Sequence, residues 1–72
     1  MAMQNGVTQG RHGRCLVVYK AGTGEIKVEQ ALGPHWVLAD TLKGDTSVWL
    51  DCGDVITRFT PTGGALYEVH DQ

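Results

Sequence analysis

The chain has 72 residues, of which 42% are hydrophobic and 19% charged, and its formal net charge is −2. This length predicts one domain with a single small core. Apolar runs stay well short of the ~20 residues that cross a bilayer, and the N-terminus lacks a secretory signal pattern, so we expect a cytoplasmic protein that does not associate with membranes. Lys and Arg are not clustered, which argues against nucleic acid as a partner.

Residues 1–13 contain three glycines and only an isolated Val7 as a branched apolar residue. Such a composition buries too little surface to offset the entropy of ordering the chain. We therefore expect a flexible N-terminal tail over residues 1–13. The single folded domain is expected to begin at Arg14 and to cover residues 14–72.

Residues 14–30 have the pattern of a β-hairpin. Residues 14–20 are rich in β-forming side chains, 21–24 read AGTG, and 25–30 alternate polar with apolar residues. If 21–24 is the hairpin loop, Val17 lies opposite Val28. The face expected to point into the core comprises Cys15, Val17, Tyr19, Ile26 and Val28.

Residues 34–43 allow two interpretations. Pro34 could begin a short helix that ends before Gly44. The apolar residues 36–39 are consecutive, however, which favours a strand buried on both faces. We prefer the strand, and an α+β domain with one helix at 34–43 packed on the sheet is the alternative.

Residues 46–70 hold three apolar runs separated by two turn signals, at 51–53 and 61–64. Glycine closes both turns, as in hairpins that require a positive φ angle. The stretch therefore predicts three adjacent antiparallel strands, with Ile56 at the centre of the core. The expected cross-strand pairs are Trp49 with Val55, Val48 with Ile56, Phe59 with Leu66, Ile56 with Val69, and Arg58 with Tyr67.

Together these elements predict a mainly β domain. We expect an antiparallel meander of five to six strands that curls into a partly open barrel of the SH3-like or OB-like kind. Both faces of the predicted meander carry large apolar residues, so a flat sheet open to water on one side would leave one of them uncovered. Such an architecture implies no function by itself.

The residue types that carry catalysis or bind metals are scattered. The two cysteines are 37 positions apart and none of the three histidines lies at zinc-ligand spacing from them. We expect Cys52 to lie at a turn tip, where a thiol reagent reaches it before Cys15, and no disulfide between the two. The sequence therefore predicts a protein that is not an enzyme, with no catalytic residues, no metal site and no cofactor.

Aromatic side chains are the best candidates for binding. The tentative binding residues are Trp36, Trp49, Arg58 and Tyr67. In SH3-type barrels aromatics line a groove for proline-rich segments, and a curled sheet leaves an edge able to accept another strand. We therefore expect a protein-interaction module that binds a protein partner through an edge strand or an aromatic patch and could form a homodimer. The alternative is an OB-type single-stranded nucleic-acid-binding protein, in which aromatics stack on bases.

Overall fold

The structure is a computed structural model that describes residues 3–71, so residues 1, 2 and 72 lie outside the described part. Residues 3–71 form strands joined by turns and contain no helix. The strands are β1 (Thr8–Arg11), β2 (Arg14–Lys20), β3 (Glu25–Leu32), β4 (His35–Leu42), β5 (Asp45–Asp51), β6 (Ile56–Thr62) and β7 (Leu66–Asp71).

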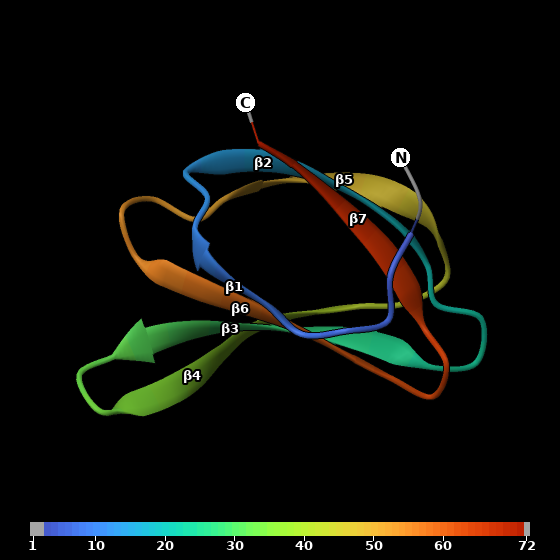
Figure 1. The fold of residues 1–72 in the computed structure, drawn as a ribbon, viewed down its shortest axis with the longest axis horizontal. Helices are drawn as coiled ribbons and strands as arrows, with labels where there is room; N and C mark the ends of the chain where they lie inside the picture. Colours follow the sequence, from blue (N-terminus) through green and yellow to red (C-terminus); the bar gives the residue numbers. More distant parts are fainter. Residues whose placement is uncertain (1–2, 72) are drawn as a thin grey trace.

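The strands make two sheets that face one another (Figure 1). One sheet has four strands in the order β1-β6-β3-β4, and the other has three in the order β5-β2-β7. Every pair is antiparallel. The predicted fold class, a small and mainly β antiparallel domain that is not a closed barrel, is confirmed. The structure has seven strands instead of five to six.

The chain passes from one sheet to the other in most of its loops, and backbone hydrogen bonds fix the segment between β4 and β5 and the segment before β1. Between β4 and β5, the Gly44 carbonyl accepts a hydrogen bond of 2.9 Å from the Ala21 backbone N–H, at the end of β2. At the N-terminal side, Gln4 exchanges two backbone hydrogen bonds with Tyr67 of β7 before the chain turns to pair with β6. Each of these segments therefore connects a strand of one sheet to a strand of the other.

The core lies between the sheets and follows the alternation of the strands. In β2, for example, Cys15, Val17 and Tyr19 are buried, whereas Leu16 and Val18 point outward and are half-buried. The inward face predicted from the sequence is confirmed. The buried side chains are Cys15, Val17, Tyr19, Ala21, Ile26, Val28, Leu42, Cys52, Thr57, Phe59, Ala65 and Tyr67.

The predicted hairpin over residues 14–30 is wrong. Val17 pairs with Val48 and Val69, and β3 pairs with β4 and β6, so the turn after β2 carries the chain from one sheet to the other. This turn packs against the β6–β7 turn so closely that a Cβ at Gly24 would overlap the Thr62 carbonyl oxygen. Crossing between layers lets the apolar faces of β2 and β3 cover each other, which a flat hairpin would not do.

The predicted pairing within residues 46–70 is also wrong. β5 and β7 both pair with β2, whereas β6 lies in the other sheet between β1 and β3. Ile56 is half-buried and opposite Arg11, so it is not at the centre of the core. Thr57 points inward instead, and its hydroxyl donates a hydrogen bond of 3.2 Å to the Val55 carbonyl, which lets a polar residue occupy a buried position.

Residues 35–42 form a strand, as we preferred, and the helical alternative is wrong. The expected burial of both faces is also wrong, because most residues of β4 are exposed. β4 pairs with β3 along its whole length, and the two join through a turn in which Gly33 has a φ of 59°. A bulge shifts the register between Val28 and Glu29 of β3, where Ala39 is the extra residue of β4.

The expectation that order begins at Arg14 is wrong, because residues 8–11 form β1 and pair with β6. Hydrogen bonds, and not apolar side chains of its own, hold this segment. The Tyr67 hydroxyl donates to the Gly6 carbonyl at 2.6 Å and also lies 2.7 Å from the Thr8 hydroxyl. The prediction of a tail covers residues 1–2 as well, which lie outside the described part.

Candidate functional surfaces

The four tentative binding residues do not form one site. Trp36 and Arg58 come together on the four-stranded sheet, and Trp49 lies on the three-stranded sheet. Tyr67 belongs to the core. Two separate outward surfaces therefore need to be considered.

Trp49 is the more exposed of the two tryptophans, with 53% of its surface accessible. It points outward from β5 opposite Leu16 of β2, and the Arg14 guanidinium carbon lies 4.9 Å from the centre of its ring. Val18 is the next outward residue of β2. We call Arg14, Leu16, Val18 and Trp49 the Trp49 surface. Two cross-strand pairs of opposite charge flank it, Arg14 with Asp51 and Lys20 with Asp45.

Trp36 and Arg58 are already engaged with each other. The Arg58 guanidinium carbon lies 4.2 Å from the centre of the Trp36 ring, and its Nη2 lies 3.0 Å from Glu29 Oε1. The same carboxylate oxygen accepts a hydrogen bond of 3.3 Å from the Thr60 hydroxyl. Arg58 is therefore opposite Glu29 and not opposite Tyr67 as predicted, and its charge is neutralised within the chain.

Tyr67 is completely buried, so the expectation that it lies at the surface is wrong. Its hydroxyl contacts Gly6, Thr8 and the Phe59 carbonyl, the last at 3.3 Å. Burial raises the pKa of Tyr67 from its ordinary value, an effect that the Thr8 hydrogen bond opposes. The residue joins the N-terminal segment to the core and cannot contact a partner.

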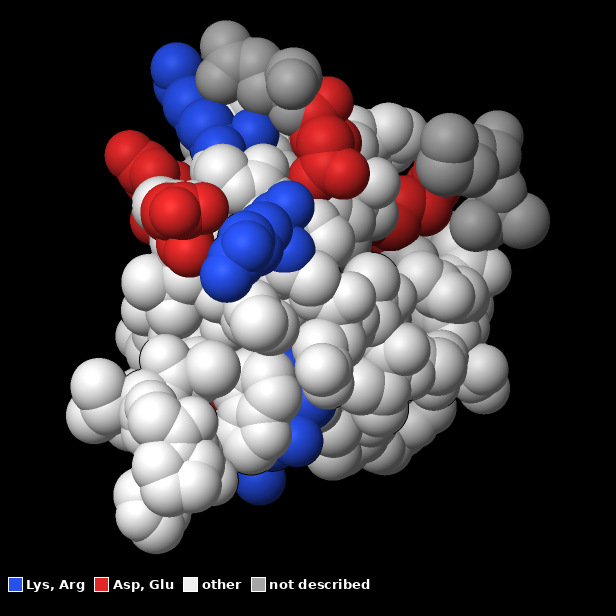
Figure 2. All heavy atoms as spheres, turned by 60° about the vertical axis from the view of Figure 1, so that its left-hand side comes forward, with Lys and Arg blue, Asp and Glu red and all other residues white. Residues whose placement is uncertain are grey.

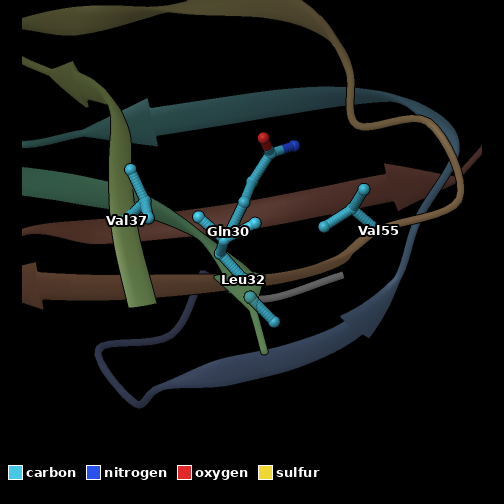
Figure 3. A pocket seen from close by; sticks show the side chains of 5 residues that line it. Gln30, Leu32, Val37 and Val55 are labelled. Carbon is cyan, nitrogen blue, oxygen red and sulfur yellow. The ribbon is translucent and has the colours of Figure 1, made fainter. Parts of the chain in front are cut away.

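A groove that the sequence did not suggest lies beside the β3–β4 hairpin. It has a volume of about 260 Å³ and is lined by Gln30, Ala31, Leu32, Val37 and Val55. Figure 3 shows Val37 on β4 and Val55 on the β5–β6 loop at opposite sides of Gln30. The three-stranded sheet does not cover these side chains, and Leu32 is 68% exposed. The only signal in the sequence is the consecutive apolar run at 36–38, which puts apolar side chains on both faces of β4.

Charged side chains are unevenly distributed over the molecular face that includes this hairpin. Figure 2 shows Lys, Arg, Asp and Glu side chains gathered at the upper end of the face, whereas its lower part is mostly uncharged apart from a Lys or Arg group near the middle. The β3–β4 hairpin occupies the lower part in Figure 1, and the view is turned only about the vertical axis. The hairpin therefore lies where charged side chains are few, and the Arg58–Glu29 pair beside Trp36 is an exception.

Both cysteines are free thiols, in agreement with the expected absence of a disulfide. The predicted exposure of Cys52 is wrong, because the β5–β6 loop turns it inward and its N–H donates a hydrogen bond of 2.7 Å to the Gly13 carbonyl. Burial, and secondarily the neighbouring Cys52, raises the pKa of Cys15 to about 12. A thiol that stays protonated at neutral pH is a poor nucleophile.

His12 is another residue of a type that can take part in catalysis, and 9% of its side chain is exposed. Its Nδ1 lies 3.0 Å from Asp71 Oδ1, and because a carboxylate only accepts, Nδ1 carries the proton. Its Nε2 is buried without a hydrogen-bond partner among the described residues, and the ring packs edge-on against Phe59. Within residues 3–71, no three His, Cys, Asp or Glu side chains converge in a way that could hold a metal ion.

Comparison with protein-family models, curated proteins and solved structures finds no match to this chain. In the part of the chain that the structure describes, there is no helix long and apolar enough to span a membrane. The two outward surfaces and the groove are therefore the features on which a functional proposal can rest.

Proposed function

We propose that the protein is a non-enzymatic protein-interaction module that binds a protein partner through the Trp49 surface. The observation that carries this proposal is the exposure of the Trp49 ring on a regular strand, next to Leu16 and beneath the Arg14 guanidinium. A large aromatic side chain on a rigid element adds contact area at a small entropic cost on binding.

The arrangement of charges around Trp49 also suits a protein partner. The apolar centre of the Trp49 surface lies between the pairs Arg14 with Asp51 and Lys20 with Asp45, which resembles the apolar core and polar rim of many interfaces. Mixed charges would not form the continuous basic track that single-stranded nucleic acid requires. Two buried free thiols fit a reducing compartment, which supports the cytoplasm as the place of action.

The proposal is tested by affinity capture from the native cell with three forms of the protein. The wild type and the matched control Thr46→Ala, an exposed position on the same strand, are expected to retain the same stoichiometric partner. Trp49→Ala is expected to weaken that complex at least about tenfold, as a hot-spot residue does. Equal retention by Trp49→Ala would rule out this surface.

Titration of labelled single-stranded DNA and RNA separates the alternative function. At about 0.15 M salt we expect no micromolar binding. Binding that is micromolar or tighter and weakens as salt rises would replace the proposal with a nucleic-acid-binding function.

A further inference from the structure

The free edge of β4 is a second surface, separate from the Trp49 surface. β4 is an end strand of the four-stranded sheet and pairs only with β3, so the backbone groups on its other side have no strand partner within residues 3–71. Most of its eight residues are exposed, including Val37 and Leu38. An exposed apolar edge is competent to pair with another strand.

The first half of β4 has few of the features that usually block such pairing. Natural edge strands are protected by Lys, by Pro within the strand, or by a bulge. Residues 35–38 read His-Trp-Val-Leu and contain neither Lys nor Pro, and the bulged residue Ala39 follows them. These four residues therefore present a regular, apolar edge.

The bulge decides which side chains share a face. His35, Val37 and Asp40 lie opposite Leu32, Gln30 and Val28 of β3, so all three point to the core side of the sheet. Trp36 and Leu38 lie opposite Ala31 and Glu29 and point to the outer side. If Ala39 were an ordinary strand residue and not the bulged one, His35 and Asp40 would point to opposite faces.

This arrangement is self-complementary. If a second β4 lies antiparallel with Val37 on the twofold axis, Trp36 faces the partner's Leu38. Because a bulge sets two residues against one, His35 then faces the partner's Asp40 across Ala39. Both residues are exposed, so the pairing matches an imidazole with a carboxylate twice and brings no like charges together.

We propose that the protein forms a homodimer in which the two β4 strands pair antiparallel about a twofold axis at Val37. The contact joins the apolar grooves of the two copies on the core side of the extended sheet. A standard interface covers ~800 Å² per partner, a large share of the 4341 Å² of this chain. A single strand pair covers less, so the dimer is a weak one. Trp49 lies on the other sheet and stays free.

Sedimentation equilibrium over a range of concentrations tests the proposal. The wild type is expected to be in reversible equilibrium between monomer and dimer. Val37→Lys, which places a charge on the axis, should raise the dissociation constant at least about tenfold, equivalent to about 1.4 kcal/mol. The matched control Thr46→Lys, on the edge strand β5, should leave it unchanged. A wild type that is monomeric throughout would overturn the proposal.

Exchange of the two charged positions tests the register. His35→Glu is expected to weaken the dimer, because it sets a carboxylate against the partner's Asp40. The double variant His35→Glu with Asp40→Lys should restore association to at least the wild-type level, since each introduced carboxylate then faces an introduced lysine. A double variant as weak as His35→Glu alone would overturn the register.

Oxidative crosslinking gives an independent measurement. With oxidised glutathione, Val37→Cys should yield a covalent dimer, because two thiols lose two protons and two electrons to form the disulfide while one oxidised glutathione becomes two reduced ones. Thr46→Cys is the matched control, and the native cysteines are buried. Equal yields from the two variants would contradict the pairing. These outcomes do not depend on Trp49→Ala, so the dimer and the proposed function can fail separately.

Discussion

At the residue scale, the burial of Cys15 makes the stability of the folded protein depend on pH. Its thiol has an ordinary pKa of 9.0, and in the folded protein its pKa is about 12, chiefly because it is buried. Between these two pH values the unfolded chain gives up the proton and the folded chain keeps it. The contribution of Cys15 to stability is therefore complete below about pH 9 and is lost as the pH rises toward 12.

We expect the free energy of unfolding to fall as the pH approaches and passes about 9, with a slope from Cys15 of at most about 1.4 kcal/mol per pH unit. Urea unfolding at several pH values between about 8 and about 9 measures this, where Tyr67, which has an ordinary pKa of 10.0, still contributes little. Cys15→Ala should be less stable at neutral pH but should show a flatter slope. Identical slopes in the wild type and in Cys15→Ala would show that Cys15 is not the residue responsible for the pH dependence.

At the element scale, β6 supplies the centre of the core through Phe59. This side chain is completely buried and packs against the rings of His12, at 5.3 Å, and Tyr67, at 6.0 Å. Phe59→Ala should reduce the free energy of unfolding by about 3–5 kcal/mol. Ile56→Ala, in the same strand but half-buried, should cost clearly less. Urea unfolding of the two variants measures both losses. A larger loss of unfolding free energy for Ile56→Ala than for Phe59→Ala would show that the inward face of β6 is assigned wrongly.

Strand faces could be predicted from the sequence, but strand partners could not. Alternation alone places Cys15, Val17 and Tyr19 inward, because the side-chain period of a strand is two. The turns at 21–24 and 51–53 contain the glycines of ordinary hairpins, yet both cross between sheets. The first crossing depends on the contact of Gly24 with Thr62, and a contact between residues so far apart leaves no local pattern.

Some features of the candidate surfaces could likewise be predicted from the sequence, and others could not. The exposure of Trp49 could be predicted, since it stands alone among polar residues on its face of β5. The burial of Tyr67 could not, because its hydroxyl partners Gly6 and Thr8 lie in a segment too poor in apolar residues to suggest order. A free sheet edge could be predicted, but not that β4 forms it, because strand order within a sheet is a property of the whole fold.

At the scale of the whole molecule, the two proposed contacts lie on different sheets, with Trp49 on β5 and Val37 on β4. A dimer paired through β4 would carry two Trp49 surfaces and could bind a partner with two sites more tightly than a monomer does. The edge of β4 would then control avidity, and the Trp49 surface would control recognition.

Self-association also couples to folding, since a dimer that forms only from folded chains stabilises them by mass action. The melting temperature of the wild type is therefore expected to rise with protein concentration, by about 4–8 °C for each kcal/mol of added stability in a domain of this size. Trp49→Ala should keep this dependence, whereas the melting temperature of Val37→Lys, whose dimer is weaker, should change less with concentration. Differential scanning calorimetry over an approximately hundredfold concentration range measures both.

A constant wild-type melting temperature would mean that β4 does not pair. Loss of the concentration dependence in Trp49→Ala would mean that the Trp49 surface forms the dimer contact instead.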